Sequence, residues 1–264
     1  MVIYPAGGRL RLTLQTDHAR LAGELAAAWG GGLFARPEPL EPIRLATEMH
    51  DEGWSELDAA PMVNPATGRP YDFLQIPQQH HTAAHTRTVE RALAAHPYAG
   101  LLTSLHATGL YRKRYGHLPH IPQRPVDPAC QEAVDRFLAD QDQLQRQLTE
   151  ELQPDPVVLW THYRWLELWD MASLWACMMN PADRGEYYLG AMPRFPGGPD
   201  ERLTLRGAGE ELFTLDPWPF SVERITLLWP ARWLEDRPYA SDGELRAALA
   251  AAPMEVQSVT LAPR

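Results

Sequence analysis

Two good metal ligands, His50 and Asp51, stand side by side in the segment "TEMHDEGW" (residues 47–54). Neighbouring residues on a helix point about 100° apart, so this pair would not chelate one ion as two residues one turn apart do. The arrangement is useful if the aspartate bridges two ions while the histidine binds only one of them. The pair therefore predicts further ligands elsewhere in the chain.

Further histidines and one aspartate lie before and after this pair, so that five of the predicted helices each contribute one ligand or a cluster of ligands. Neutral imidazole and carboxylate groups suit zinc, iron or manganese, and two cysteines without a CxxC motif do not form a structural zinc site. We predict a centre of divalent transition metal, with two ions of iron, manganese or zinc. Its candidate ligands are His18, His50, Asp51, His81, His85, His106 and Asp170.

Each of these residues also has an ordinary structural interpretation. A buried Asp170 would hydrogen-bond neighbouring tyrosine or tryptophan side chains, although burying an unpaired carboxylate costs several kcal/mol. A lone buried histidine such as His106 is more often structural than a ligand. The metal interpretation therefore depends on the ordered ligand series acting together.

The order and spacing of the series resemble the HD-domain superfamily of helical, metal-dependent phosphohydrolases, whose defining pair is matched here by His50 and Asp51. The extra histidines before the last aspartate are similar to the dinuclear branch. That branch includes nucleotide and cyclic-dinucleotide phosphodiesterases and di-iron oxygenases related to myo-inositol oxygenase. The resemblance implies that one metal is held by His18, His50, Asp51 and Asp170.

The resemblance also implies a second metal, bridged by Asp51 and held by His106 and one histidine of the 80–85 cluster. We favour His81; His85 lies one turn away on the same face and is either its neighbour or the ligand itself. No "GYP" follows the second histidine, which argues against a cyclic dinucleotide as substrate. The segments "HDEGW" and "LLTSLHATGLY" also resemble a bacterial family without an assigned activity, expected to cover the full chain.

Asp51, Glu52 and Lys113 are the candidate catalytic residues. Lys113 comes seven residues after His106, two helical turns along the same predicted helix, where it would bind a phosphate or a carboxylate. Its alternative is a solvated basic helix end. Glu52, or Glu48, would shuttle a proton, or either is simply a surface charge. The irregular loop 60–77 would close over the metals or form ordinary surface.

The elements that would position these side chains are mainly helical. Helical patterns cover residues 16–29, 43–57, 78–96, 98–117, 127–153 and 157–179, and residues 2–14 predict a β-hairpin. After residue 182 the pattern changes to strands and one capped helix. We predict a mainly α fold with an HD-like helical bundle core (1–182) and a small β-rich C-terminal region (183–264). The N-terminal hairpin is a candidate further part of that β-rich region.

Composition restricts the partners. A formal net charge of −10 argues against nucleic acid or an anionic membrane as the main partner. No apolar stretch reaches the roughly 20 residues that span a bilayer, and the start of the chain lacks a signal-peptide pattern. Two isolated cysteines fit a reducing cytosol. We expect a cytoplasmic protein with a small anionic substrate, while nothing in the sequence sets the oligomeric state.

Three functions fit the ligand series. The first is metal-dependent hydrolysis of a phosphate ester, because two bridged ions would lower the pKa of a shared water and hold the phosphoryl oxygens. The second is a di-iron oxygenase acting on a small polar substrate, which the same ligands would serve. The third is a non-enzymatic ligand-binding or sensory protein with a vestigial metal site.

Overall fold

Helices form around the predicted helical patterns in the computed structural model, which describes residues 1–264. The longest of them begins after Asp155, whose side chain accepts from the main-chain N–H groups of Val157 and Val158 at 2.8 and 3.1 Å. The helices are α1 (Gln15–Ala28), α2 (Leu40–Met49), α3 (Ser55–Ala59), α4 (Gln78–Ala95), α5 (Pro97–Gly109), α6 (Gln131–Leu152), α7 (Pro156–Met178) and α8 (Asp242–Ala251), with short 3-10 turns η1 (Glu52–Trp54), η2 (Lys113–Gly116), η3 (Pro128–Cys130) and η4 (Pro181–Asp183).

The predicted N-terminal hairpin is confirmed. Its turn places Gly7 and Gly8 at φ 57° and 75°, and positive φ at both turn residues is typical of tight β-hairpins. The sheet has the order β1-β2-β6-β7-β5-β4-β3, antiparallel except between β5 and β7. Its strands are β1 (Val2–Ala6), β2 (Arg9–Thr13), β3 (Glu186–Pro193), β4 (Asp200–Gly209), β5 (Leu212–Asp216), β6 (Ile225–Glu235) and β7 (Met254–Pro263).

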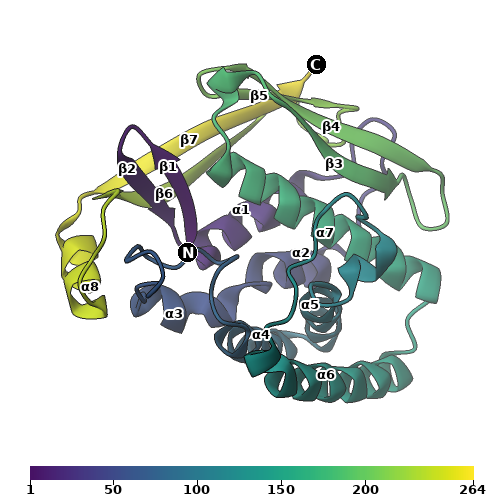
Figure 1. Ribbon diagram of the computed structural model, residues 1–264. Helices are drawn as coiled ribbons and strands as arrows, with labels where there is room; N and C mark the ends of the chain where they lie inside the picture. The colour runs from purple at the N-terminus through teal and green to yellow at the C-terminus, as the bar shows by residue number, and fades with distance from the viewer.

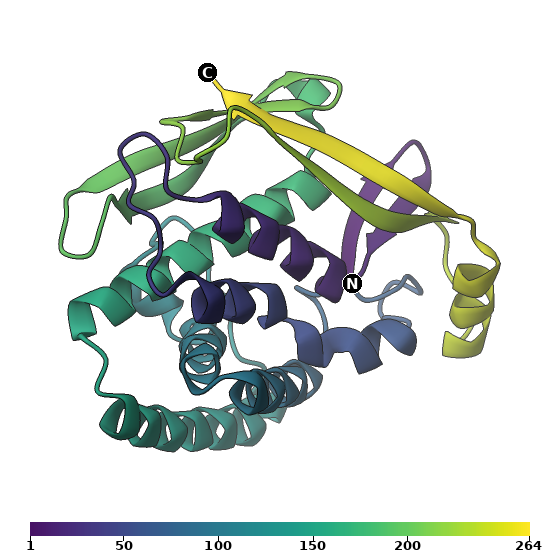
Figure 2. The ribbon, with the colours of Figure 1, turned by 180° about the vertical axis from the view of Figure 1, so that it is seen from behind.

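The curved sheet lies over α1 and α7, and the remaining helices of the first two-thirds of the chain lie below these two (Figures 1 and 2). One core of 34 buried residues runs from Val2 to Leu261 and so includes side chains from the helices and from the sheet. Trp29 at the end of α1 contacts Trp169 of α7 and Phe220 of the β5–β6 connection. The sheet thus supports the two helices that carry the first and last members of the ligand series.

The predicted fold class is wrong. Helices hold 48% of the residues and strands 22%, and the strands form one curled mixed sheet of seven, so the β part is not a small addition to a mainly α bundle. Two features caused the error. The local pattern did not predict β3, and it could not show that Arg9 of β2 pairs with Glu235 of β6 at the other end of the chain. None of the helices combines the length and apolar character that crossing a membrane requires.

Candidate metal centre

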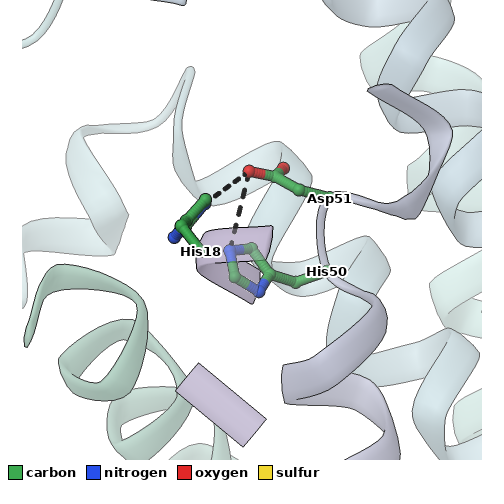
Figure 3. Close-up of side chains that lie close together, drawn as sticks. All are labelled: His18, His50 and Asp51. Atoms are coloured by element: carbon green, nitrogen blue, oxygen red, sulfur yellow. Dashed lines mark hydrogen bonds and ion pairs between the residues drawn. The ribbon is translucent and has the colours of Figure 1, made fainter. Parts of the chain in front are cut away.

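The predicted helix over residues 43–57 breaks at the His-Asp pair. α2 ends at Met49, His50 still has helical angles (φ −59°, ψ −18°), and Asp51 leaves them (φ −124°, ψ 17°). The break turns both side chains toward His18 of α1. The Asp51 Oδ2 atom lies 2.9 Å from His18 Nε2 and 3.7 Å from His50 Nε2 (Figure 3). Adjacent residues therefore share one site because the regular helix ends between them.

His106 from α5 and Asp170 from α7 complete this cluster. The Asp170 Oδ1 atom lies 3.3 Å from His50 Nε2 and 4.0 Å from His18 Nε2, and the His50 and His106 ring centroids are 5.0 Å apart. All five side chains are buried, none more than 5% exposed. Two overlapping groups each place one ligand atom per residue within 4.8 Å: His18, His50 and Asp51, and His50, His106 and Asp170.

Hydrogen bonding sets the tautomer of His18. Its Nδ1 atom lies 2.9 Å from Ser173 Oγ, and the Ser173 hydroxyl donates to the main-chain carbonyl of Asp170 at 2.8 Å. Ser173 Oγ therefore accepts from the His18 Nδ1–H group, which leaves the His18 Nε2 lone pair facing the Asp51 carboxylate at 2.9 Å. Two acceptors at that distance need a cation, either a proton or a metal ion.

The other two histidines of the cluster are oriented in the same way. The His50 Nδ1–H group donates to the main-chain carbonyl of Thr47 at 2.6 Å, and the His106 Nδ1–H group donates to Glu167 Oε1 at 2.6 Å. The His50 Nε2 atom is buried without a hydrogen-bond partner. Metal-binding histidines are commonly held by such a bond from the second ring nitrogen, which directs the free nitrogen at the ion.

The charges of the cluster also fit a bound cation. No lysine or arginine lies within 4.0 Å of the Asp51 or Asp170 carboxylate, whose ion-pair partners are His18 and His50. Burial opposes ionisation, yet the histidines hold the pKa of both carboxyls well below the usual range. Against its own burial, the two carboxylates raise the pKa of His50 to about 9. Buried carboxylates need a compensating positive charge, and a divalent ion held by neutral imidazoles supplies one.

His81 and His85 of α4 lie beside the cluster but outside both groups of ligand atoms. The His85 ring nitrogens are both buried without a hydrogen-bond partner, and the His85 ring centroid is 6.1 Å from that of His106. His81 Nδ1 instead lies 2.7 Å from the Tyr111 hydroxyl. Burial lowers the pKa of both histidines, that of His81 to about 4. Both are therefore neutral imidazoles near pH 7.

Gly53 and Trp54 join the His-Asp segment to α4. The Gly53 N–H donates to Thr88 Oγ1 at 2.9 Å, and the Arg87 guanidinium donates to the Gly53 carbonyl at 2.8 Å. The Trp54 ring stands edge-on to the rings of His81 and His85, with centroid distances of 5.4 and 6.0 Å. The "HDEGW" motif thus positions two ligand candidates on one side and packs against two more on the other.

A cavity of about 160 Å³ opens over the cluster. Its wall includes apolar side chains from the 60–77 loop and three basic residues from the segment that follows α5. The residues that line the cavity include His18, Asp51, Trp54, Phe73, Leu74, His81, His85, His106, Lys113, Arg114, Arg124 and Asp170.

A family model described as "Protein of unknown function (DUF3891)" matches residues 1–236. The chain belongs to the DUF3891 family. The match contains the whole cluster and ends just after β6, so α8 and β7 follow it. No curated protein and no solved structure matches the chain.

In this DUF3891 protein the two candidate catalytic residues outside the cluster have different positions. Lys113 lines the cavity, but not on the predicted helix, because α5 ends at Gly109 and Lys113 has a left-handed backbone with φ 52°. Glu52 does not line the cavity. Its carboxylate lies 3.8 Å from Arg91 Nη1, and its side chain is 41% exposed. A proton shuttle at Glu52 has no support in this geometry.

Sequence reasoning missed Glu167 and Arg114. Glu167 is fully buried in α7, and its Oε2 atom lies 3.1 Å from Arg114 Nε while its Oε1 atom accepts from His106. A charged residue three positions before Asp170 in an apolar helix shares a face with it, and this spacing was the available signal. Its partners come from two other segments, which no local pattern identifies.

Proposed function

We propose that this DUF3891 protein is a metal-dependent hydrolase of a small phosphate ester. The observation that carries the proposal is the cluster itself: three imidazole rings, each held through its Nδ1 atom, converge on two buried carboxylates that have no lysine or arginine partner. Such a donor set favours zinc, manganese or iron over calcium or magnesium. One ion would be held by His18, His50, Asp51 and Asp170.

A second ion would be held by Asp51, His106 and a histidine of α4. His85 suits this position because both of its ring nitrogens are buried and free of hydrogen bonds. His81 is hydrogen-bonded to Tyr111 and faces the same cavity, where it would orient a substrate or serve as the ligand in place of His85. The proposed centre is therefore dinuclear, with Asp51 between the ions.

Bound divalent ions would acidify a water molecule and offset the charge of the phosphoryl oxygens. The chain itself holds the imidazoles in the ligand tautomer through Ser173, the Thr47 carbonyl and Glu167. Phe73 and Leu74 give the cavity an apolar wall. The cations on the wall favour an anionic substrate such as a phosphate ester. We propose a cytoplasmic setting, in which the two buried free cysteines stay reduced.

Metal analysis of aerobically purified protein, together with assays on p-nitrophenyl phosphate and its diester, tests the proposal. We expect bound zinc or manganese and metal-dependent release of p-nitrophenol. Iron with a mixed-valence EPR signal and no phosphoesterase activity would instead support the oxygenase. Protein that binds none of these metals would contradict both and leave the vestigial interpretation.

Replacing Glu167 with glutamine is expected to weaken metal binding by about 10- to 100-fold. The amide keeps the shape of the side chain but removes the charge that polarises the His106 imidazole. Competition with a chromogenic chelator measures the affinity. Glu132→Gln, at an exposed position of α6, is the matched control and should leave affinity unchanged. Equal affinities for the two variants would show that Glu167 only fills the core.

A further inference from the structure

Lys113 is the only lysine among the 24 basic residues of the chain, and it lines the cavity. Together with Arg114 and Tyr115 it forms a run of three residues with left-handed backbone angles, at φ 52°, 47° and 51°. Residues other than glycine rarely adopt this conformation, and such strain persists only where surrounding contacts hold it, often at functional sites. The turn therefore needs anchors, and the structure supplies them.

The side chains around Lys113 are all bound to other parts of the protein. Arg112 makes two bonds to one carboxylate, the Arg114 guanidinium reaches a buried carboxylate, and the Tyr115 hydroxyl contacts another hydroxyl. Lys113 alone has neither a hydrogen bond nor an ion pair, so the anchored turn presents its ammonium to the cavity mouth. The partners are Asp142 for Arg112 at 2.7 Å, Glu167 for Arg114 at 3.1 Å and Thr108 for Tyr115 at 2.5 Å.

A second cation of the wall, Arg124, also keeps its charge available. Its guanidinium donates to the main-chain carbonyls of Ile76 and Gln75, at 2.5 and 3.2 Å, and it pairs with no carboxylate. Main-chain carbonyls orient the guanidinium without neutralising it. Arg114, in contrast, is paired with Glu167. The wall therefore carries two uncompensated positive charges in a chain whose net charge is −10.

These two cations lie at a different depth in the cavity from the histidine and aspartate cluster. Lys113 and Arg124 are exposed, whereas the cluster residues are buried at the base of the cavity. The acidic residues of the lining are Asp51 and Asp170, both in the cluster, so no carboxylate competes at the rim. We infer that Lys113 and Arg124 bind a second anionic group, a carboxylate or a phosphate, of a substrate whose phosphoryl group occupies the base. This inference rests on the proposed function for the position of the phosphoryl group.

Binding of two matched phosphonates tests the inference without turnover. Ethylphosphonate has one anionic group, and 2-carboxyethylphosphonate has the same phosphonate with a carboxylate added. With the full chain supplemented with Mn²⁺, isothermal titration calorimetry should show about tenfold or more tighter binding of the carboxylated probe. Lys113→Met and Arg124→Met should remove this preference, Lys113→Arg should retain it, and Arg136→Met, at an exposed site on α6, should not change it.

A second readout uses the uniqueness of Lys113. A limiting amine-reactive ester should label the Lys113 peptide, as read by mass spectrometry, and the carboxylated probe should protect it while ethylphosphonate should not. Equal binding of the two probes, or a preference that survives Lys113→Met and Arg124→Met, would overturn the rim site and leave the hydrolase proposal untouched. No binding of either probe would overturn the rim site and also count against a phosphoryl group at the base, and the phosphoester assays would then decide the hydrolase proposal separately. A carboxylate preference without hydrolysis of any phosphoester would support the rim site and reject the hydrolase.

Discussion

Asp51→Asn is expected to abolish metal binding and to reduce phosphoester hydrolysis on the order of a thousandfold or more. Asp51 Oδ2 is the atom that both His18 and His50 approach, at 2.9 and 3.7 Å, and it is the proposed bridge between two ions. An amide is a poor bridging ligand because it carries no charge. Metal per chain, measured by elemental analysis after gel filtration, should fall to background.

Asp51→Asn should also remove the stabilisation of the native state by added metal. A metal at about 100 times its Kd stabilises the native state by about 2.7 kcal/mol, so added Mn²⁺ or Zn²⁺ should raise the Tm of the wild type and not that of the variant. Asp135→Asn, an exposed carboxylate on α6, is the control and should behave as wild type. If Asp51→Asn and a companion His50→Gln variant kept their metal and only lost stability, the cluster would not be a metal centre.

Gly53→Ala is expected to lower the free energy of unfolding by about 3 kcal/mol or more. An added Cβ at Gly53 would lie 2.1 Å from the Ala84 carbonyl oxygen and 2.5 Å from the Thr88 nitrogen, both main-chain atoms of α4. Backbone atoms of a packed helix cannot rotate away, so η1 and α4 must separate. That separation moves Asp51 relative to His81 and His85, and metal affinity should fall with stability.

Urea denaturation of metal-free protein measures this effect. Gly243→Ala in α8 is a matched control, because the nearest atom to its added Cβ is Ser241 Oγ at 3.6 Å. Alanine restricts the unfolded chain more than glycine does, so this control should be stabilised by about 0.4–1 kcal/mol. A Gly53→Ala variant as stable as the wild type would mean that η1 does not pack against α4 as described.

Residue type and position along the chain predicted much of the candidate site. Histidine and aspartate have few reasons to recur inside apolar helices, so His18, the His50–Asp51 pair, His106 and Asp170 stood out by type and position alone. Their order along the chain predicted a shared site, and the structure brings these five side chains together. The prediction of a helix through Asp51 is wrong, because Asp51 has non-helical backbone angles. Contacts with residues distant in sequence, such as His18, offset the cost of ending the helix there, and a local pattern does not contain them.

The β part of the fold was the larger error. Strand propensity marked most of the C-terminal segments, yet pairing between β2 and β6 depends on residues at opposite ends of the chain. A side-chain pattern of period two shows that a segment has a buried face, but not which strand lies beside it. The sequence pattern marks strands but not their partners. It therefore predicted a small β-rich region where the structure has one seven-stranded sheet.

The amino-acid sequence by itself determined the kinds of donor atoms, the approximate helices that carry them and the presence of a single lysine, since these follow from residue type and local periodicity. Only the tertiary structure decided the geometry. It turned Asp51 out of the helix, paired His106 with Glu167, left both ring nitrogens of His85 free and placed Lys113 on a left-handed turn at the cavity rim. Each of these depends on contacts between segments distant in sequence, whose energies exceed the local preferences that a sequence pattern reports.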